Sequence, residues 1–361
     1  MDKEEIIENS TYEAALKRSA EIEVEIAVNK SKYRVLTGDR PTGSLHIGHL
    51  FGSLENRVRL QDMGIETFIV IADYQVLTDR EVASTISQNV KELVMDYLSV
   101  GLDPDNKKTF IFPHSHVPEL NQLLLPFLFL VTNSELDRNP TVKEEIKASQ
   151  LKNISAGMYT YPIHQAADIL SVKGNLVPVG KDQLPHLEMT RAVSRRFNNR
   201  FGNGKEVFKE PEALLSNAPL ILGLDGSQKM SKSRNNAVML KATEEETANL
   251  IKKAKTDSER VIAYDPQNRP EVSNLLRICS LAGGKDPEEI ASEIGDGGAG
   301  KLKKLTTDLL NAYLEPIRRK RREIEKNEEY VRDILIRGIR FAREEAEKTL
   351  KEVRKAMNME F

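Results

Sequence analysis

The sequence contains a single cysteine, Cys279, and no long apolar run. One cysteine cannot form a disulfide within the chain, which excludes a disulfide-stabilised secreted domain and favours the cytosol. The most apolar run, residues 123–131, is shorter than the ~20 residues of a membrane-spanning helix and contains Pro126. Because the N-terminus is acidic and polar, it does not have the features of a secretory signal. We therefore expect a cytoplasmic protein that does not enter a membrane.

Neither sign of charge prevails, since 53 Lys and Arg residues accompany 55 Asp and Glu residues, for a formal net charge of −2. This balance excludes a general attraction to nucleic acids, so any site for RNA must be a local patch. Hydrophobic residues make up 39% and charged residues 30% of the chain, as is typical of globular proteins. The length allows roughly two or three domains and a sizeable core.

Four short apolar segments predict buried strands, and segments with helical periodicity separate them. The strands are expected at residues 34–36, 67–72, 109–112 and 176–179. This alternation predicts an α/β fold, a Rossmann-like parallel sheet with helices on both faces. In such sheets, ligands bind beyond the carboxyl ends of the strands. Gly38, Asp73 and Gly180 follow three of these ends, so one cleft can collect them.

The pattern divides the chain into three parts. Residues 1–32 predict an N-terminal extension of one or two amphipathic helices, and residues 33–239 contain the Rossmann-like domain. Within that domain, residues 113–155 form a short helical connecting insert. After about residue 240 the strand signal disappears, so residues 240–361 predict a mostly helical C-terminal domain.

A glycine-containing turn follows the first predicted strand. The segment from Leu36 to His49 reads LTGDRPTGSLHIGH, in which a strand ends and a helix begins near Leu45. Helix N-termini present free N–H groups and a partial positive charge, which suit a phosphate. His46 and His49 can donate hydrogen bonds to a phosphate as charge builds up on it. Since His-x-Gly-His alone is a weak motif, the alternative is a polar helix start with two surface histidines.

A second motif, KMSKS, lies at residues 229–233 in a polar loop. Five specified residues in a row arise by chance in about one chain of this length in ten thousand. Two lysines on a mobile loop, Lys229 and Lys232, can neutralise a departing pyrophosphate in the transition state. The alternative is an ordinary exposed loop of lysine and serine.

Asp168 is the only acid in residues 161–170 (YPIHQAADIL), which are otherwise mostly apolar or small. A buried carboxylate is costly unless it is paired, and an N–H donor on a substrate would pair it. The alternative is a helix aspartate bonded to a neighbouring side chain. Residues 177–183 (VPVGKDQ) follow a strand end and can hold a ribose hydroxyl and an α-amino group, or can simply cap the next helix.

Metal-binding signals are weak. His114 and His116 stand two apart with no third ligand nearby in the sequence, so we expect a loop with satisfied histidines rather than a zinc site. Basic residues gather near the C-terminus and could face a phosphate backbone. They are Arg318, Arg319, Arg321 and Arg322. The alternative, a solvated charged helix face, is about equally supported because several glutamates follow at once.

The order and separation of these motifs resemble a class I aminoacyl-tRNA synthetase, and the details resemble the tryptophanyl-tRNA synthetases. The resemblance covers about residues 33–359 and rests on LTGDRPTG before HIGH, on YP…QAADIL, on VPVGKDQ and on KMSKS. It implies an enzyme that activates L-tryptophan with ATP, releases pyrophosphate, and transfers the amino acid from the adenylate to tRNA(Trp). It also implies Mg²⁺ bound with ATP, a homodimer, a catalytic domain at residues 33–239 and an anticodon-binding domain at residues 240–361.

The resemblance further implies which residues form the site. His46, His49, Lys229 and Lys232 would be catalytic. Those that contact ATP would be Arg40, Pro41, Thr42, Gly48, His49, Gly180, Lys181, Asp182, Ile221, Lys229, Met230, Ser231, Lys232 and Ser233. Those that hold tryptophan would be Tyr161, Gln165, Asp168 and Gln183. Asp168 would accept a hydrogen bond from the indole N–H, and the insert at residues 113–155 would make a dimer contact.

Two alternatives to this function remain. The spacing from Tyr161 through Gln165 to Asp168 also resembles the tyrosyl-tRNA synthetases, in which the glutamine and aspartate serve tyrosine. A catalytically silent paralogue that binds RNA is the second alternative. The intact histidine and lysine motifs argue against it, since a silent protein does not need them.

Overall fold

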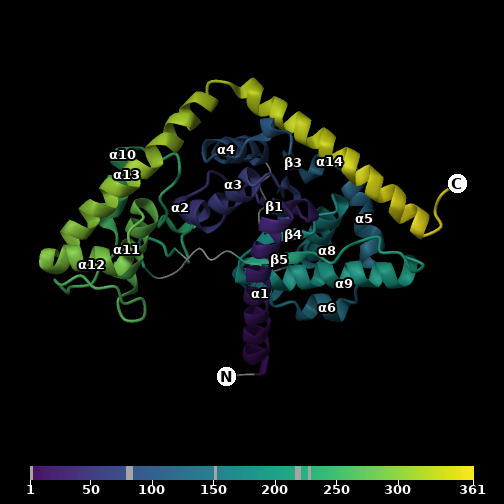
Figure 1. The fold of residues 1–361 in the computed structure, drawn as a ribbon, viewed down its shortest axis with the longest axis horizontal. Coiled ribbons are helices and arrows are strands. Elements are labelled where there is room, and N and C mark those ends of the chain that lie inside the picture. The colour runs from purple at the N-terminus through teal and green to yellow at the C-terminus, as the bar shows by residue number, and fades with distance from the viewer. Residues whose placement is uncertain (1–2, 79–83, 150–152, 216–220, 227–228) are drawn as a thin grey trace.

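The computed structural model describes residues 3–78, 84–149, 153–215, 221–226 and 229–361, without the side chains of residues 3–11, 148, 149 and 233 (Figure 1). At the centre lies a five-stranded parallel sheet with the strand order β3-β2-β1-β4-β5. The strands are β1 (Arg34–Asp39), β2 (Glu66–Ile71), β3 (Thr109–Pro113), β4 (Leu176–Val179) and β5 (Glu212–Leu215).

Alternate side chains of the strands pack against helices on opposite faces of the sheet. On β2, Phe68 and Val70 belong to one core with residues of α5 (Pro118–Leu128), α8 (Ala156–Ser171) and α9 (Leu184–Phe201). Ile69 and Ile71 belong to another core with residues of α4 (Ile86–Ser99). Because side chains alternate along a strand, this sheet is buried on both sides. The predicted Rossmann-like fold is therefore confirmed.

The fifth strand was not predicted, and the N-terminal extension accounts for its stability. This extension is one helix, α1 (Lys3–Val28), which packs against β5. The N–H of Leu215 donates to Oγ of Ser19 at 2.9 Å, and Arg18 pairs with Glu212 at 2.9 Å. The helix thus satisfies a backbone donor that an edge strand would otherwise leave open.

The helical C-terminal region falls into two parts. Four helices pack together at one end of the molecule (Figure 1). They are α10 (Glu244–Lys253), α11 (Pro270–Gly283), α12 (Pro287–Ile294) and α13 (Gly298–Ile324). The last helix, α14 (Glu328–Ala356), returns to pack against β3 and α5. Gly338 allows this approach, because a Cβ added there would lie 1.9 Å from the carbonyl oxygen of Ile111.

Four further α-helices are described around the sheet and in the segment between β3 and β4. They are α2 (Ile47–His49), α3 (Glu55–Asp62), α6 (Asn133–Arg138) and α7 (Pro140–Ser149). Within the described part of the chain, no helix combines the length and the apolar character needed to cross a membrane.

Candidate active site

The carboxyl edge of the sheet collects the predicted motifs. β1 leads directly into Arg40, and β4 leads directly into Gly180. On the other side of β1, the strands β2 and β3 are followed by Asp73 and His114. Since all five strands are parallel, these segments meet along one edge, where ligands of such folds bind.

An ion pair that the sequence did not single out anchors the end of β1. Arg57 of α3 is almost fully buried and pairs with Asp39 at 2.5 Å. The hydroxyl of Tyr97 donates to the same carboxylate at 2.6 Å. Burial alone would raise the pKa of Asp39, but Arg57 lowers it to about 2. The pair therefore stays charged at neutral pH and fixes the strand end beneath the turn.

The rings of His46 and His49 each accept a backbone hydrogen bond at the start of α2. The N–H of Gly48 donates to Nδ1 of His46 at 3.2 Å, and the N–H of His46 donates to Nδ1 of His49 at 3.3 Å. Burial, with smaller effects of His49 and Lys229, lowers the pKa of His46 to about 3, and burial also lowers the pKa of His49. Both rings are therefore neutral, and each carries its proton on Nε2 as a donor.

The loop that carries Lys232 lies against the turn that precedes α2. Gly43 has φ +121°, a conformation that favours glycine, and a Cβ added there would lie 2.3 Å from Nζ of Lys232. The segment after the loop is bonded to the histidine segment, since the N–H of Ile47 donates to the Val238 carbonyl at 3.0 Å. The structure thus joins two motifs that lie far apart in the sequence.

Further residues of the predicted ATP site lie around this junction. The N–H of Thr42 donates to the carbonyl of Arg40 at 2.8 Å and closes a turn in which Pro41 is buried. Ile221 is buried, and its carbonyl accepts from the N–H of Met230 at 3.4 Å. The Ser231 N–H donates to the side chain of Asn236. Lys229 and Lys232 are exposed, and the Ser233 side chain lies outside the described residues.

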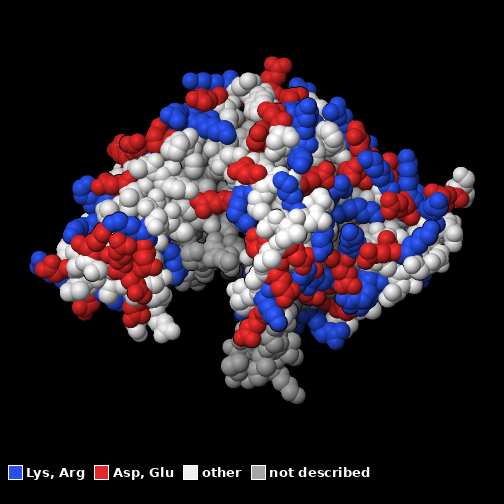
Figure 2. Space-filling view, viewed as in Figure 1, with Lys and Arg blue, Asp and Glu red and all other residues white. Residues whose placement is uncertain are grey.

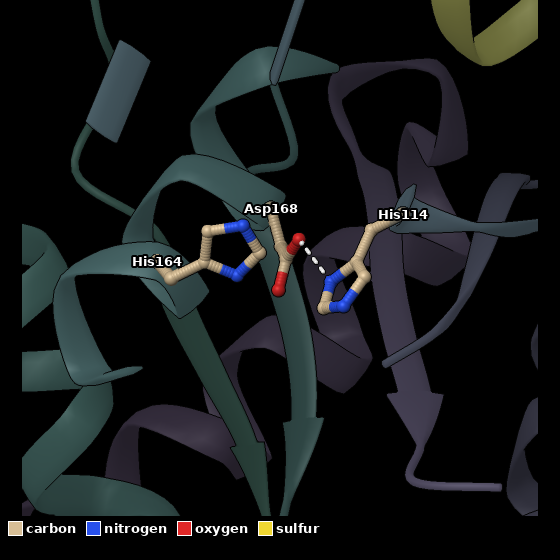
Figure 3. A group of neighbouring side chains, drawn as sticks. All are labelled: His114, His164 and Asp168. Atoms are coloured by element: carbon tan, nitrogen blue, oxygen red, sulfur yellow. Dashed lines mark hydrogen bonds and ion pairs between the residues drawn. The ribbon is translucent and has the colours of Figure 1, made fainter. Parts of the chain in front are cut away.

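Asp168 lies on the face of α8 that points toward His114, as Figure 3 shows. Its carboxylate is 2% exposed, and Oδ1 lies 3.0 Å from Nδ1 of His114. His164, one turn earlier on α8, lies beside both groups, with its ring edge-on to that of His114 at 4.6 Å. Nε2 of His164 donates to Oδ1 of Asn121 at 2.8 Å. The buried carboxylate expected from the sequence is present.

The arrangement of the two histidines and Asp168 favours a hydrogen-bond network over a metal site. Their possible ligand atoms lie within 4.8 Å of one another. However, the backbone N–H of Tyr74 donates to Nε2 of His114 at 3.0 Å. Because Nε2 is the acceptor, Nδ1 carries a proton and faces Asp168. Burial would lower the pKa of His114, but Asp168 and Asp73, whose Oδ1 lies 3.4 Å from Nε2, outweigh burial and raise that pKa. A protonated Nδ1 has no lone pair for a metal ion, so His114 is not a ligand in this arrangement.

Tyr161 and Gln165 lie earlier on α8 than Asp168. The hydroxyl of Tyr161 lies 2.9 Å from Nε2 of His186 on α9. Burial lowers the pKa of His186 to about 4, so that ring is neutral, and burial raises the pKa of Tyr161. Gln165 is half-buried one turn later on the same helix. Tyr161, Gln165 and Asp168 thus lie along one side of α8, which leads toward the strand ends.

The turn after β4 is more exposed than the rest of the site. Gln183 donates from Nε2 to Oδ2 of Asp182 at 3.2 Å, and Gly180, Lys181 and Asp182 are exposed. Nζ of Lys181 lies 5.4 Å from the ring centre of Tyr12 on α1. Lys181 therefore has a neighbour in the N-terminal helix, which the sequence did not indicate.

Two of the four arginines predicted to bind tRNA are buried, so that prediction is wrong for them. Arg318 donates to Oγ1 of Thr247 at 2.7 Å. Arg321, 2% exposed, pairs with carboxylates of α4. Both lie on the inner face of α13, whereas Arg319 and Arg322 lie on its exposed face. Figure 2 shows basic and acidic side chains interspersed along the helices of the visible face.

Sequence reasoning missed His114 as a member of the site. It was interpreted as a loop histidine, but it is fully buried and joins the end of β3 to Asp168. No local signal could have revealed this, because its partner belongs to a different helix far along the chain. Only the close packing of α8 against the strand ends brings the two together.

Comparisons of the sequence identify a family and relatives of this chain. The sequence model of the family described as "tRNA synthetases class I (W and Y)" matches residues 28–315. The chain is 43% identical over 341 residues to the tryptophan–tRNA ligase of Clostridium longisporum, covering 92% of this chain and 98% of that protein. It is 41% identical over 336 residues to that of Thermotoga maritima, covering 91% and 100%.

Solved structures of tRNA synthetases are also similar to this chain. Tryptophanyl-tRNA synthetase from Campylobacter jejuni, complexed with ADP and tryptophan, superimposes with a TM-score of 0.77 at 30% identity, covering 90% of this chain and 99% of that one. Tyrosyl-tRNA synthetase from Archaeoglobus fulgidus, complexed with L-tyrosine, gives a TM-score of 0.63 at 22% identity, covering 82% and 92%. The second likeness concerns the fold alone.

Proposed function

Because the chain belongs to the class I tRNA synthetases of the tryptophan and tyrosine type, we propose that it joins L-tryptophan to tRNA(Trp) with consumption of ATP. The carboxylate of tryptophan attacks the α-phosphate of ATP, which gives tryptophanyl-adenylate and pyrophosphate. The terminal ribose hydroxyl of the tRNA then attacks the adenylate carbonyl and releases AMP. The relatives at 41–43% identity are tryptophan enzymes, so tyrosine is not the favoured substrate.

The observation that carries this proposal is the buried carboxylate of Asp168 at the carboxyl edge of the sheet. An indole ring is apolar except for its N–H, so a pocket that reads it needs one buried acceptor. Asp168 is placed to be that acceptor, with Tyr161, Gln165 and Gln183 nearer the amino-acid backbone. The phenol of tyrosine could also meet a carboxylate, which is why the substrate must be tested directly.

The ATP end of the site is built for charge stabilisation. The Nε2–H groups of His46 and His49 donate to the α-phosphate, and Lys229 and Lys232 neutralise the pyrophosphate as it leaves. Arg40, Thr42, Gly180 and their neighbours line the nucleotide. No side chain need act as a covalent nucleophile, because positioning and electrostatics supply the rate.

We propose that Mg²⁺ enters with ATP. The carboxylates beside the turn that precedes α2 are already paired with arginines, Glu92 and Asp96 with Arg321 and Asp39 with Arg57. This fits an ion held mainly by phosphate oxygens and water. When bound, the ion would supply positive charge to the phosphates. The protein residues would still orient the α-phosphate and meet the departing pyrophosphate.

Dimerisation and tRNA binding are further parts of the proposal. Leu125 and Phe129, in the insert, are 61% and 71% exposed, and a second copy of the chain would remove them from water. The tRNA anticodon would meet the distal helices α10 to α13, where Arg319 and Arg322 are exposed. Such an enzyme would work in the cytoplasm.

Amino-acid-dependent exchange of pyrophosphate into ATP, measured with each of the twenty amino acids, tests the function. Tryptophan alone should support exchange. Exchange with tyrosine instead of tryptophan would show that the Gln165–Asp168 pair serves tyrosine. If none of the twenty supported exchange, a silent RNA-binding paralogue would be the better description.

A further inference from the structure

We propose that His114 is the positioning residue for indole recognition: it holds one oxygen of Asp168 so that the other oxygen meets the indole N–H. The inference rests on the proposed role of Asp168 as the indole acceptor. It adds a residue from a different strand end, one that needs no contact with the substrate.

The direction of the bond between His114 and Asp168 is set by the protein backbone. The Tyr74 N–H donates to Nε2 of His114 at 3.0 Å, and a backbone N–H can only donate. Nδ1 therefore carries a proton, in the neutral or the charged ring, and donates a hydrogen bond to Oδ1 of Asp168 at 3.0 Å. The ring is fully buried, so neither bond competes with water.

The second carboxylate oxygen of Asp168 is left available. Among the described residues, none donates a hydrogen bond to Oδ2, and Figure 3 shows a single dashed bond on the carboxylate. A buried acceptor with one oxygen fixed and one open suits a single ligand N–H.

His164 cannot perform the same task, although it lies as close to Asp168. Its Nε2–H donates to Asn121 at 2.8 Å, so its remaining nitrogen is an acceptor and cannot donate to a carboxylate. His114 is thus the histidine that orients Asp168. His164 lies beside the pair without a hydrogen bond to Asp168 and offers a matched control.

The experiment compares tryptophan with its analogue in which sulfur replaces the indole nitrogen, using kcat/KM in pyrophosphate exchange. His114→Leu should raise the KM for tryptophan roughly 10–100-fold, as loss of a hydrogen bond to a charged group does. The preference for tryptophan over the analogue should fall by a similar factor, while the KM for ATP changes less than about twofold. His114→Asn, which keeps a donor near the Nδ1 position, should restore most of the preference. His164→Gln, which keeps the bond to Asn121, should retain it.

The outcomes separate this inference from the proposed function. If His114→Leu keeps the wild-type preference while Asp168→Ala loses it, Asp168 reads the indole and His114 only fills space. If the wild type shows no preference, the role of Asp168 itself fails.

The wild-type protein provides a test that does not depend on folding of a variant. Nitrogen NMR of histidine-labelled protein should show His114 protonated at Nδ1, whether or not Nε2 is also protonated. The opposite tautomer would overturn the inference, because Asp168 would then have no donor on this ring.

Discussion

Arg321 of α13 and Asp96 of α4 form a buried ion pair at 2.5 Å, and the other oxygen of the same carboxylate accepts the backbone N–H of Leu45 at 2.6 Å. Leu45 directly precedes His46, so the helical C-terminal region is tied to the histidine motif through one carboxylate. Glu92, also on α4, forms a second ion pair with Arg321 at 2.6 Å. The buried arginine therefore supports the active site and is not available to RNA.

Replacing Arg321 by methionine should lower the free energy of unfolding by about 3–5 kcal/mol, because Asp96 would keep a buried carboxylate without its cation, whereas Glu92 retains Lys241 at 3.0 Å. Urea unfolding measures this change. Arg322→Met is the matched control, since Arg322 is exposed and should change stability by less than about 1 kcal/mol. Equal stability of the two variants would contradict the assigned role of Arg321.

Reversing the two exposed arginines, Arg319 and Arg322, to glutamate should weaken tRNA binding and flatten its dependence on salt, as loss of phosphate contacts does. Filter binding at several salt concentrations measures both effects. Pyrophosphate exchange without tRNA should remain unchanged. Wild-type charging of tRNA by the double variant would place the tRNA surface elsewhere.

Lys232→Ala should slow pyrophosphate exchange roughly 10²–10³-fold, because the lysine meets charge that develops in the transition state. ATP affinity, measured by equilibrium binding, should fall much less. Lys326→Ala, at an exposed site between α13 and α14, provides the control. A loss of ATP affinity as large as the loss of rate would mean that Lys232 holds ground-state ATP instead.

Stability should decrease as the pH falls below about 6.5. Burial lowers the pKa of His46 to about 3 and that of His186 to about 4, from an ordinary value of 6.5. Between these values the unfolded chain binds protons that the folded protein does not, so acid favours unfolding. Each histidine should contribute about 2 kcal/mol of lost stability between pH 6.5 and 5.

Unfolding free energies of the wild type and His186→Gln, measured across this pH range, check that prediction. The variant should show a shallower fall, because one of the depressed groups is gone. Parallel pH profiles for the two proteins would show that His186 does not titrate as its burial requires.

Gly338→Ala should destabilise the protein by about 2 kcal/mol or more, because the new methyl group would lie 1.9 Å from a backbone oxygen that cannot move aside. Gly300→Ala is the control within a helix, since no atom lies within 4 Å of an added Cβ there. That change should be neutral or stabilise the helix by up to about 1 kcal/mol. Thermal unfolding distinguishes the two; similar melting temperatures would mean that α14 does not need the close approach.

Much of the fold followed from the sequence, because β1 to β4 are apolar segments that end at recognisable turns. β5 was missed since it is a four-residue edge strand whose stability depends on Ser19 of another element. Within the site, the residues that belong to sequence motifs could be recognised, because each motif groups several of them. His114 could not, because its role arises only when β3 and α8 pack. The error at Arg318 and Arg321 has a similar cause, since a run of basic residues on a long helix does not reveal which face is covered.

Because α14 returns to pack against β3, the strand and the helix that covers it are synthesised at different times. The strand is translated long before the helix that packs against it. Until then, the nascent chain presents an outer strand with an uncovered apolar surface, which can pair with another copy. A protein released before α14 is complete should therefore aggregate rather than persist as a shortened enzyme. Burial of β3 thus depends on a helix that the ribosome adds long after the sheet has been made.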